Sequence, residues 1–460
     1  MEQHAIQGST DLTLFSHNLA VSSTTEIYQK QLTSGGILRY KADKNRNKGL
    51  SDEKERMTYH RSGRHLKREE KIFVSRVQNY LIGTYTEPIL SGSGEIFPGN
   101  GEGIYRLELD TKTGELKMEL AYGGVKNPSF LTVFPVTEKT EESSKKARLY
   151  ILAVNECSRF QGEDGGGLTV LENSEDGITL RQTLLTHGAD PCHVFADITD
   201  GNVIVSNYTG GSICAYRLTE EGILEEKDFV RHTGKGAEPY RQNGPHVHSC
   251  IPLDKPGIFL TADLGTDRIV AYRMGNSGKL EEKKLLTYSC RPGNGPRFGE
   301  FHKRNRCLYV VNELACTVTV LRYENENQPL TLLQEIQAVE GRKSNNTSAD
   351  LHLSPDGGFL YVSNRGENTL TVFRVSSDDG RLEKIQNVPS GGRTPRNFCM
   401  DPGGRWLLAA NQDSDEIVLF ERNPQNGMLK EKAGISVPTP VCICPIPFLT
   451  GRSEERMRRF

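Results

Sequence analysis

The chain has 460 residues and a formal net charge of −2, so it has no overall positive field that would attract nucleic acid or an anionic membrane. Hydrophobic residues make up only 35% of it, and no apolar run approaches the roughly 20 residues of a membrane span. Its 46 glycines are typical of many short strands joined by turns. We therefore expect a soluble, β-rich protein with neither a nucleic-acid partner nor a membrane.

The two ends of the chain differ in composition from its middle. Residues 1–70 are rich in Ser, Thr, Lys and Arg without any sustained hydrophobic period, which predicts a polar, disordered extension. Residues 71–450 form the expected folded domain, and residues 451–460 form a basic tail. The start lacks the basic segment and apolar core of a signal peptide, and the ten cysteines include no C-x-x-C pair. A reducing, cytoplasmic setting fits best.

From residue 80 onward, one pattern of short apolar runs repeats along the chain. Each run ends in a polar residue, and successive members of this series lie 47 to 56 residues apart: Asn155, Asn207, Asp263, Asn312, Asn364 and Asn411. A period near 50 residues, with several strands in each unit, predicts the blades of a β-propeller. The polar residues themselves are expected to bond backbone groups at strand ends.

A second series precedes the first and is usually marked by proline. Its members are Pro128, Pro191, Pro245, Pro296, Pro395 and Pro440, with Ala349 in the same place without proline. They predict the starts of seven innermost strands, hence an all-β fold with seven blades. The last inner strand, from Pro440, has no partner after it, and the strand at 80–86 has none before it. We expect these two to pair and close the ring, which removes an exposed sheet edge.

One segment lengthens the first repeat. Residues between Phe134 and Lys146 are rich in Glu, Thr, Ser and Lys, which predicts a surface loop inserted between two strands.

The starts of the inner strands and the loops after the second strands should meet at the mouth of a central channel. Four side chains there are candidates for catalysis: His248, Arg297, Glu313 and Arg365. Six more are candidates for substrate binding: His246, Arg396, His193, Tyr208, Glu156 and Asp350. The abundance of arginine predicts an anionic ligand, because a guanidinium binds planar anions with two hydrogen bonds.

Each group also has a plainer explanation. His246 and His248 lie two apart on one strand face and could hold a metal, but no third ligand with matching spacing follows. Glu313 and Arg365 could form an ion pair between blades. His193 points to the other face of its strand, which favours a structural role.

Hydrolysis of a lactone needs an activated water and a cation near the developing oxyanion. His248 or Glu313 as base, with Arg297 or Arg365 as the cation, meets that requirement without a cofactor.

The same residues carry a resemblance to a known family. The chain resembles the propeller lactonases typified by bacterial 6-phosphogluconolactonase across residues 78–447. Matching stretches include Gly83-Thr-Tyr-Thr, Asn127-Pro-Ser-Phe-Leu, Pro191-Cys-His, Pro245-His-Val-His-Ser, Gly295-Pro-Arg, Val311-Asn-Glu-Leu, Tyr361-Val-Ser-Asn-Arg-Gly and Thr394-Pro-Arg-Asn-Phe. Each is weak alone, but their shared order is specific. The N-terminal extension has no counterpart in that family.

The resemblance implies hydrolysis of 6-phospho-D-glucono-1,5-lactone to 6-phosphogluconate in the pentose phosphate pathway, on a small anionic sugar lactone and without a cofactor. The fold is also similar to carboxymuconate-lactonizing enzymes, in which a His, two Arg and a Glu act. By motif, these fall on His248, Arg297, Glu313 and Arg365.

Two departures from the family pattern lie beside the site. Phe298 stands where a His is common, and Asp350 replaces a Glu.

Three functions remain open at this point: a sugar-lactone hydrolase, an enzyme that opens or forms a muconate-type lactone, and a non-catalytic propeller scaffold. A scaffold would need an apolar face, and the single Trp406 with a cationic mouth argues against it. The sequence leaves the oligomeric state open.

Overall fold

The computed structural model describes residues 76–447, apart from 91–93, 95, 139–145, 175, 220 and 342–344, together with the backbone of two short strands nearer the N-terminus. Those two strands, β1 (Gln29–Leu32) and β2 (Leu38–Lys41), pair antiparallel. The chain divides into two compact units, Met1–Arg76 and Val77–Phe460. The rest of the extension predicted over 1–70, and the basic tail 451–460, lie outside the described residues.

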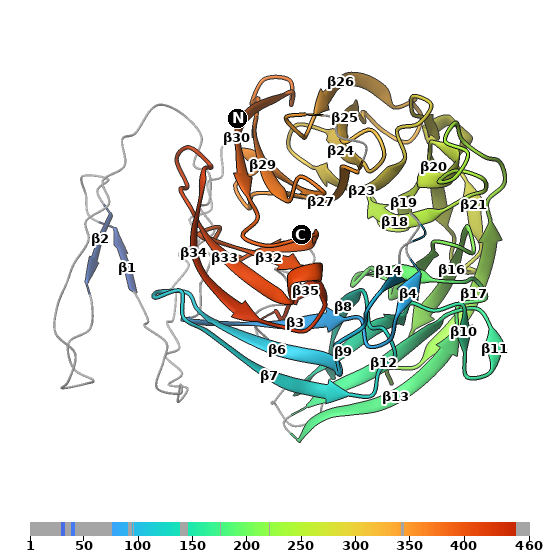
Figure 1. Ribbon diagram of the computed structural model, residues 1–460, viewed down its shortest axis with the longest axis horizontal. Helices are drawn as coiled ribbons and strands as arrows, with labels where there is room; N and C mark the ends of the chain where they lie inside the picture. The colour runs from blue at the N-terminus through green and yellow to red at the C-terminus, as the bar shows by residue number, and fades with distance from the viewer. Residues whose placement is uncertain are drawn as a thin grey trace, which may run out of the picture. The chain divides into compact units, whose positions relative to one another are not determined.

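The second unit consists of seven antiparallel sheets around one axis (Figure 1), which confirms the predicted seven-bladed propeller. In order from the innermost strand outward, the first blade consists of β8 (Leu131–Glu138), β9 (Lys146–Asn155), β12 (Gly167–Ser174) and β13 (Gly177–Leu185), and the second of β14 (Pro191–Ala196), β15 (Asn202–Asn207), β16 (Ser212–Leu218) and β17 (Leu224–Arg231). The third consists of β18 (Val247–Pro252), β19 (Ile258–Asp263), β20 (Arg268–Met274) and β21 (Leu280–Glu282), and the short strand β22 (Tyr288–Ser289) also pairs with β20. The next three are β23 (Pro296–His302), β24 (Cys307–Asn312), β25 (Thr317–Arg322), β26 (Thr331–Gln337); β27 (Thr347–Leu353), β28 (Phe359–Arg365), β29 (Thr369–Val375), β30 (Leu382–Pro389); and β31 (Pro395–Met400), β32 (Trp406–Asn411), β33 (Glu416–Arg422), β34 (Leu429–Ser436). The seventh is β35 (Pro440–Pro445), β3 (Val77–Thr84), β6 (Gly103–Asp110), β7 (Leu116–Gly123).

The remaining elements are small. Two-residue strand pairs lie in loops, namely β4 (Ile89–Leu90) with β5 (Ile96–Phe97) and β10 (Arg159–Phe160) with β11 (Glu163–Asp164). The helical elements of the described chain are three-residue 3-10 turns: η1 (Leu264–Thr266), η2 (Lys284–Leu286) and η3 (Gln412–Ser414). Within the described residues, no helix is long and apolar enough to cross a membrane.

The seventh blade combines the two ends of the propeller sequence. Its inner strand β35 pairs with β3, so that Ile82 faces Ile443 and Gly83 faces Cys442. This pairing confirms the predicted ring closure. Because a propeller's blades hold one another in place, the closing pair fixes all seven blades around the axis.

The hydrophobic core is distributed between the blades. Seven clusters of buried side chains can be separated, and each draws on two neighbouring blades. Between the sixth and seventh blades, for example, Trp406 of β32 packs with Tyr80 of β3 and Leu107 of β6. The short apolar runs of the second strands are therefore buried on both faces, where each sheet packs against its neighbours.

The repeated polar residues at the ends of the second strands bond backbone groups in four blades, as predicted. Asn155, Asn207 and Asn411 donate to the carbonyls of Lys126, Thr186 and Ser390, and Asp263 accepts from the amides of His246 and Gly265. Asn312 and Asn364 instead donate to threonine hydroxyls one strand further out. In those two blades the prediction was wrong, because a threonine pair on the adjacent strand satisfies the amide.

The insert predicted between Phe134 and Lys146 is shorter than expected. Strands β8 and β9 continue their pairing out to Glu138 and Lys146, so residues 135–138 of the predicted loop are strand. Only residues 139–145 fall outside the described residues. A strand pair can continue through polar residues, because its backbone hydrogen bonds do not require an apolar side-chain face.

The closing pair yields a stability prediction. Replacing Ile443, which is 5% exposed between the sixth and seventh blades, with alanine removes packing on both sides. We expect the free energy of unfolding, measured by denaturant titration, to fall by about 2–4 kcal/mol. The exposed Pro445→Ala, on the same strand, is the control and should change it by less than about 1 kcal/mol. Equal effects of the two substitutions would contradict the assigned closure.

Candidate active site

The site is created by one irregularity repeated around the ring. In β18, Val247 pairs with Asp263 and Ser249 pairs with Ala262, which are adjacent in β19. His248 is therefore an additional residue of β18 without a partner in β19, which is a β-bulge. Bulges at the same point of the inner strand involve Cys192, Arg297, Asp350, Arg396 and Val441. A bulge re-aims the side chain that it inserts. Four of the predicted site residues, His248, Arg297, Asp350 and Arg396, therefore owe their direction to a bulge near the start of their strand.

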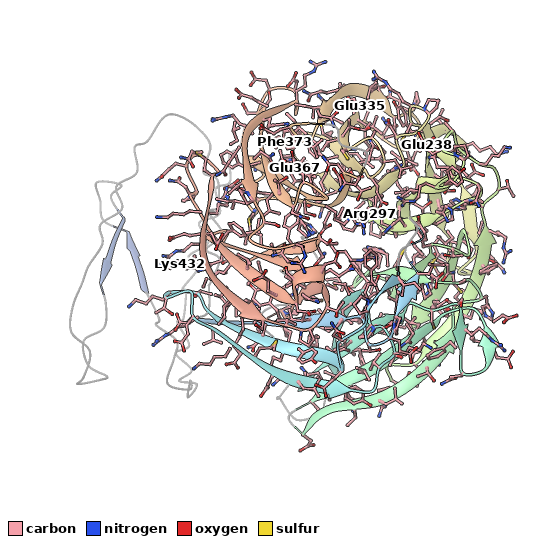
Figure 2. All side chains as sticks on the ribbon, viewed as in Figure 1. Glu238, Arg297, Glu335, Glu367, Phe373 and Lys432 are labelled. Atoms are coloured by element: carbon pink, nitrogen blue, oxygen red, sulfur yellow. The ribbon has the colours of Figure 1, made fainter. Side chains whose placement is uncertain are left out.

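The inner strands contact one another in a complete circle, so these bulges gather at one end of the axis. Arg297 lies near the middle of the ring (Figure 2).

Glu313 is the centre of the larger group of charges, which we call the Glu313 cluster (Glu313, Arg241, Arg297 and Arg365). Its Oε2 lies 3.0 Å from Arg297 Nε and 2.9 Å from Arg365 Nη2, and its Oε1 contacts Arg241 Nη2. Burial raises the pKa of the Glu313 carboxyl, but the three guanidinium groups outweigh it and hold that pKa well below its usual range. Glu313 is therefore an anion at neutral pH, with both oxygens occupied.

Arg297 is the most enclosed of these arginines, with 5% of its surface exposed. Its Nη1 donates to the Ala349 carbonyl, and burial together with Arg365 lowers its pKa to about 10. It remains a cation at neutral pH. The predicted pair between Glu313 and Arg365 is thus part of a larger network.

Arg241 is a site residue that the sequence analysis did not single out. It lies in the segment between β17 and β18, and its Nη2 also donates to the Tyr208 hydroxyl at 3.3 Å. The segment is held by buried Gln242, which donates to the Leu264 carbonyl at 2.7 Å. The sequence feature that could have pointed to Arg241 is the unusual length and basic character of the connection between β17 and β18.

A second, smaller group contains the other buried carboxylate. In this Glu156 cluster (Glu156, Tyr85 and Arg396), the Tyr85 hydroxyl donates to Glu156 Oε1 at 3.1 Å, and Arg396 Nη2 lies 3.7 Å from the same oxygen. The Arg396 guanidinium also lies 5.3 Å from the Tyr85 ring centroid. Burial raises the pKa of Glu156 despite the opposing charge of Arg396. Tyr85, like Arg241, was not foreseen.

His248 is also at this end of the axis. Its side chain is largely buried, with Nδ1 3.6 Å from the Cys192 sulfur and its ring 5.4 Å from that of Tyr208. Burial and the charge of Arg297 hold the pKa of His248 well below its usual value, so the imidazole is neutral. His246 stacks on Tyr208 at 4.6 Å between ring centroids and contacts its carbonyl through Nδ1. Both histidine rings therefore contact Tyr208, and His248 also contacts Cys192.

His193 and Asp350, which were candidates for substrate binding, have partners within the protein. The His193 ring lies between Phe130 and Phe298, 4.4 and 5.7 Å away, and burial lowers its pKa to about 3. Asp350 accepts hydrogen bonds from Asn397, from His352 and from the Phe398 amide. The structure thus places His193 in a layer of aromatic rings and uses Asp350 to join inner strands.

No group of three or more His, Cys, Asp or Glu side chains in the described part of the chain is arranged to hold a metal ion.

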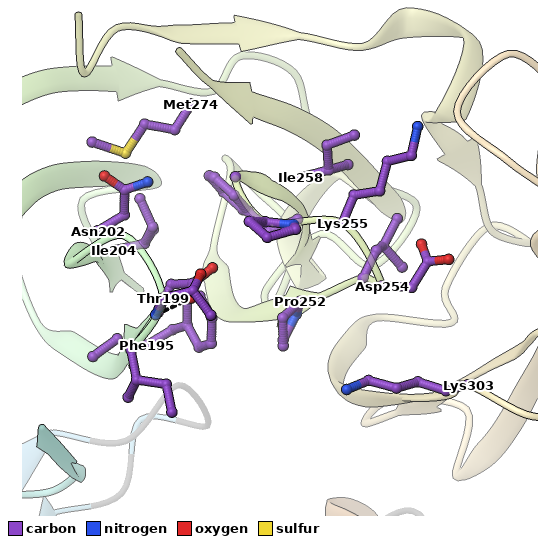
Figure 3. A pocket seen from close by; sticks show the side chains of 17 residues that line it. Phe195, Thr199, Asn202, Ile204, Pro252, Asp254, Lys255, Ile258, Met274 and Lys303 are labelled. Carbon is purple, nitrogen blue, oxygen red and sulfur yellow. Dashed lines mark hydrogen bonds between the residues drawn. The ribbon is translucent and has the colours of Figure 1, made fainter. Parts of the chain in front are cut away.

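A separate pocket of about 160 Å³ lies at the turns between the inner and second strands of the second and third blades (Figure 3). Its lining includes Phe195, Thr199, Asn202, Lys255 and Met274. These turns are at the opposite strand ends from the bulges, and the volume is below the roughly 300 Å³ of ordinary ligand sites. The charged clusters therefore remain the candidate site.

Comparison with known proteins agrees with this fold. A family model described as "Lactonase, 7-bladed beta-propeller" matches residues 79–445. Two relatives bear the name 6-phosphogluconolactonase: that of Bacillus subtilis is 30% identical over 365 residues, 79% of this chain and 96% of its own, and that of Formosa agariphila is 32% identical over 337 residues, 72% and 91%. The solved structure of the periplasmic gluconolactonase of Pseudomonas aeruginosa matches with a TM-score of 0.69 at 28% identity, over 81% of this chain and 99% of its own.

The Glu313 cluster yields a prediction about stability and pH. Glu313→Gln leaves three guanidinium groups without their shared anion, and we expect the free energy of unfolding at pH 7 to fall by about 3 kcal/mol. Because the folded state lowers the pKa of Glu313, its contribution is complete above 4.5, the ordinary glutamate value, and is lost as the pH falls below it. The difference between wild type and variant should therefore shrink below pH 4.5.

The control is Glu119→Gln, which breaks an exposed pair with Arg106 at 3.3 Å. Exposed pairs contribute about 0–1 kcal/mol. Denaturant unfolding at several pH values measures both variants, and a Glu313 effect as small as that of Glu119 would refute the assignment.

Proposed function

The chain belongs to the seven-bladed β-propeller lactonases, a family of lactone hydrolases, and on that premise we propose that it hydrolyses 6-phospho-D-glucono-1,5-lactone to 6-phosphogluconate. One observation carries the choice of a phosphorylated substrate. The two clusters hold four guanidinium groups against two carboxylates, a formal excess of two positive charges. A phosphate monoester carries about −1.5 to −2 at pH 7, so it balances this excess.

In the proposed reaction, a water molecule attacks the lactone carbonyl and the ring ester bond opens. His248, Arg297, Glu313 and Arg365 are the proposed catalytic group, and His246, Arg396, Tyr208 and Glu156 complete the binding surface. The guanidinium groups supply fixed positive charge for the anionic group of the substrate and for the developing oxyanion, which costs no reorganisation during the reaction. Glu313 holds three of them in position. We propose that no metal or other cofactor takes part.

The product of this reaction belongs to the pentose phosphate pathway, and we propose a cytoplasmic enzyme. All ten cysteines are free, and nine of them are buried. Reduced thiols in this number are typical of a reducing compartment.

The same charge excess would suit a dicarboxylate lactone of the carboxymuconate type, which also carries two negative charges. This alternative shares the arginines, so only a direct comparison of substrates separates the two. The match of residues 79–445 to the lactonase family gives no support to the hypothesis of a non-catalytic scaffold.

The substrate prediction is tested by acid release at constant pH. We expect purified protein to accelerate hydrolysis of 6-phosphogluconolactone above the rate in buffer, and to prefer it over unphosphorylated glucono-1,5-lactone and a muconate-type lactone. Activity should survive dialysis against a chelator. No acceleration over buffer would end the proposal, and loss of activity with the chelator, restored by a metal, would end its metal-free form.

A second prediction concerns His248. His248→Ala removes the neutral imidazole beside Arg297, and we expect kcat/KM to fall about 10²-fold, the size of a missing proton-transfer or hydrogen-bonding group. His187→Ala is the matched control, since His187 is exposed and paired with Glu226 of the outer strand β17. An active His248→Ala protein would remove this histidine from the reaction.

A further inference from the structure

The two clusters at the end of the axis differ in charge balance. The Glu313 cluster has three guanidinium groups and one carboxylate, an excess of two positive charges. The Glu156 cluster has one of each and a neutral Tyr85, whose pKa burial raises well above its usual value. A substrate with one dianionic group and one uncharged carbonyl therefore meets two different environments.

The Glu313 cluster has hydrogen-bond donors left over for an anion. Arg241 and Arg365 make their hydrogen bonds and ion pairs with the described residues through Nη2, and their side chains are 20% and 16% exposed. Their Nη1 groups are thus available to a ligand. Guanidinium pairs of this kind suit the planar, multidentate recognition of phosphate or carboxylate groups.

Glu313 itself is poorly placed to accept a proton from water. Both of its oxygens are already occupied by guanidinium groups, and these hold its pKa well below the usual range. A general base is most effective when its pKa lies near the working pH. Glu313 therefore fits the role of a fixed counter-ion.

The Glu156 cluster offers the opposite combination. Glu156 Oε2 and the Ser129 hydroxyl are buried beside each other, and neither has a further hydrogen-bond partner among the described residues. Arg396 donates no hydrogen bond to any described residue, although its side chain is only 15% exposed. Leaving part of the hydrogen-bonding capacity of a buried carboxylate and of its paired guanidinium unused is costly, and such groups are enriched at functional sites.

The two clusters are connected through the Cys192–His248 pair. The Cys192 thiol contacts His248 and lies within electrostatic range of Glu156, Arg297 and Arg396. The charges of the two clusters therefore act on each other, and His248 lies close enough to feel both.

We propose that the substrate bridges the clusters, with its dianionic group on the Glu313 cluster and its lactone carbonyl on the Glu156 cluster, where Glu156 is the general base. The assignment of Arg241 to the phosphate depends on the function proposed above, whereas the role of Glu156 holds for any lactone.

The reaction balances as follows. Glu156 takes a proton from water while the water oxygen bonds to the carbonyl carbon, and the resulting oxyanion faces Arg396. Collapse of this tetrahedral intermediate breaks the bond to the ring oxygen, which takes the proton back from Glu156. The products are a free hydroxyl and a carboxylic acid, which then loses its proton to solvent.

Arg241→Gln tests the dianion site. We expect kcat/KM for 6-phosphogluconolactone to fall at least tenfold more than kcat/KM for unphosphorylated glucono-1,5-lactone, mainly through KM. Arg291→Gln is the matched control, because Arg291 is 69% exposed and pairs with Glu335. It should change neither value by more than about twofold.

Glu156→Gln tests the base. It keeps the size of the side chain and an oxygen for Tyr85, and we expect kcat to fall at least 100-fold on both lactones. The groups that face Glu156 are Arg396, Tyr85, Asp190 and Cys192. Since burial raises the pKa of Glu156, wild-type kcat should decline on the acidic side at a pH above 4.5, and this limb should be absent from the residual activity of Glu156→Gln. Glu156→Asp should retain the limb with a lower rate.

Four outcomes would overturn the inference: Glu156→Gln with kcat within tenfold of wild type, an acidic limb that survives in it, an acidic limb abolished instead by Glu313→Gln, or an equal effect of Arg241→Gln on both lactones. A wild-type protein that hydrolyses only the unphosphorylated lactone would refute the proposed substrate, yet the Glu156 arm would still be tested on that lactone.

Discussion

The backbone bulge in the inner strands is the constraint on which the site depends. An ordinary strand alternates its side chains between two faces, and in a propeller both faces of an inner strand pack against neighbouring blades. One extra residue near the start of the strand interrupts this alternation and frees a side chain for the end of the axis. Repetition of the device around the ring places His248, Arg297 and Arg396 together, although they are far apart in the chain.

A bulge can only collect these groups if the ring is closed. The pairing of β35 with β3 holds the first and last parts of the propeller sequence in one sheet, and it places Tyr85 between the blades that carry Glu156 and Arg396. The distributed core has the same consequence. Because each hydrophobic cluster lies between two blades, a packing defect in one interface would shift the charged side chains that both blades carry.

Charge compensation is the second theme of this site. Four buried or half-buried guanidinium groups would repel one another strongly without counter-ions. Two carboxylates reduce this repulsion unequally, and the remaining positive charge is what a dianionic substrate would neutralise. Binding and stability are therefore linked in this site: the residues that hold the arginines in place also set the charge that the ligand meets.

The amino-acid sequence determined the architecture. A 47-to-56-residue period and the proline series were enough to predict seven blades, and the unpaired strand at each end predicted the closure, since local patterns decide strand formation and an open edge is unfavourable. The starts of the inner strands also led to His248 and Arg297, and the positions after the second strands led to Glu313 and Arg365. It did not lead to Arg241 and Tyr85, because one lies in an irregular segment between blades and the other follows a strand whose partner is about 360 residues away in the chain. Only the tertiary structure decided how the charges divide into two clusters, since pairing between Glu and Arg depends on which blades face each other across the axis.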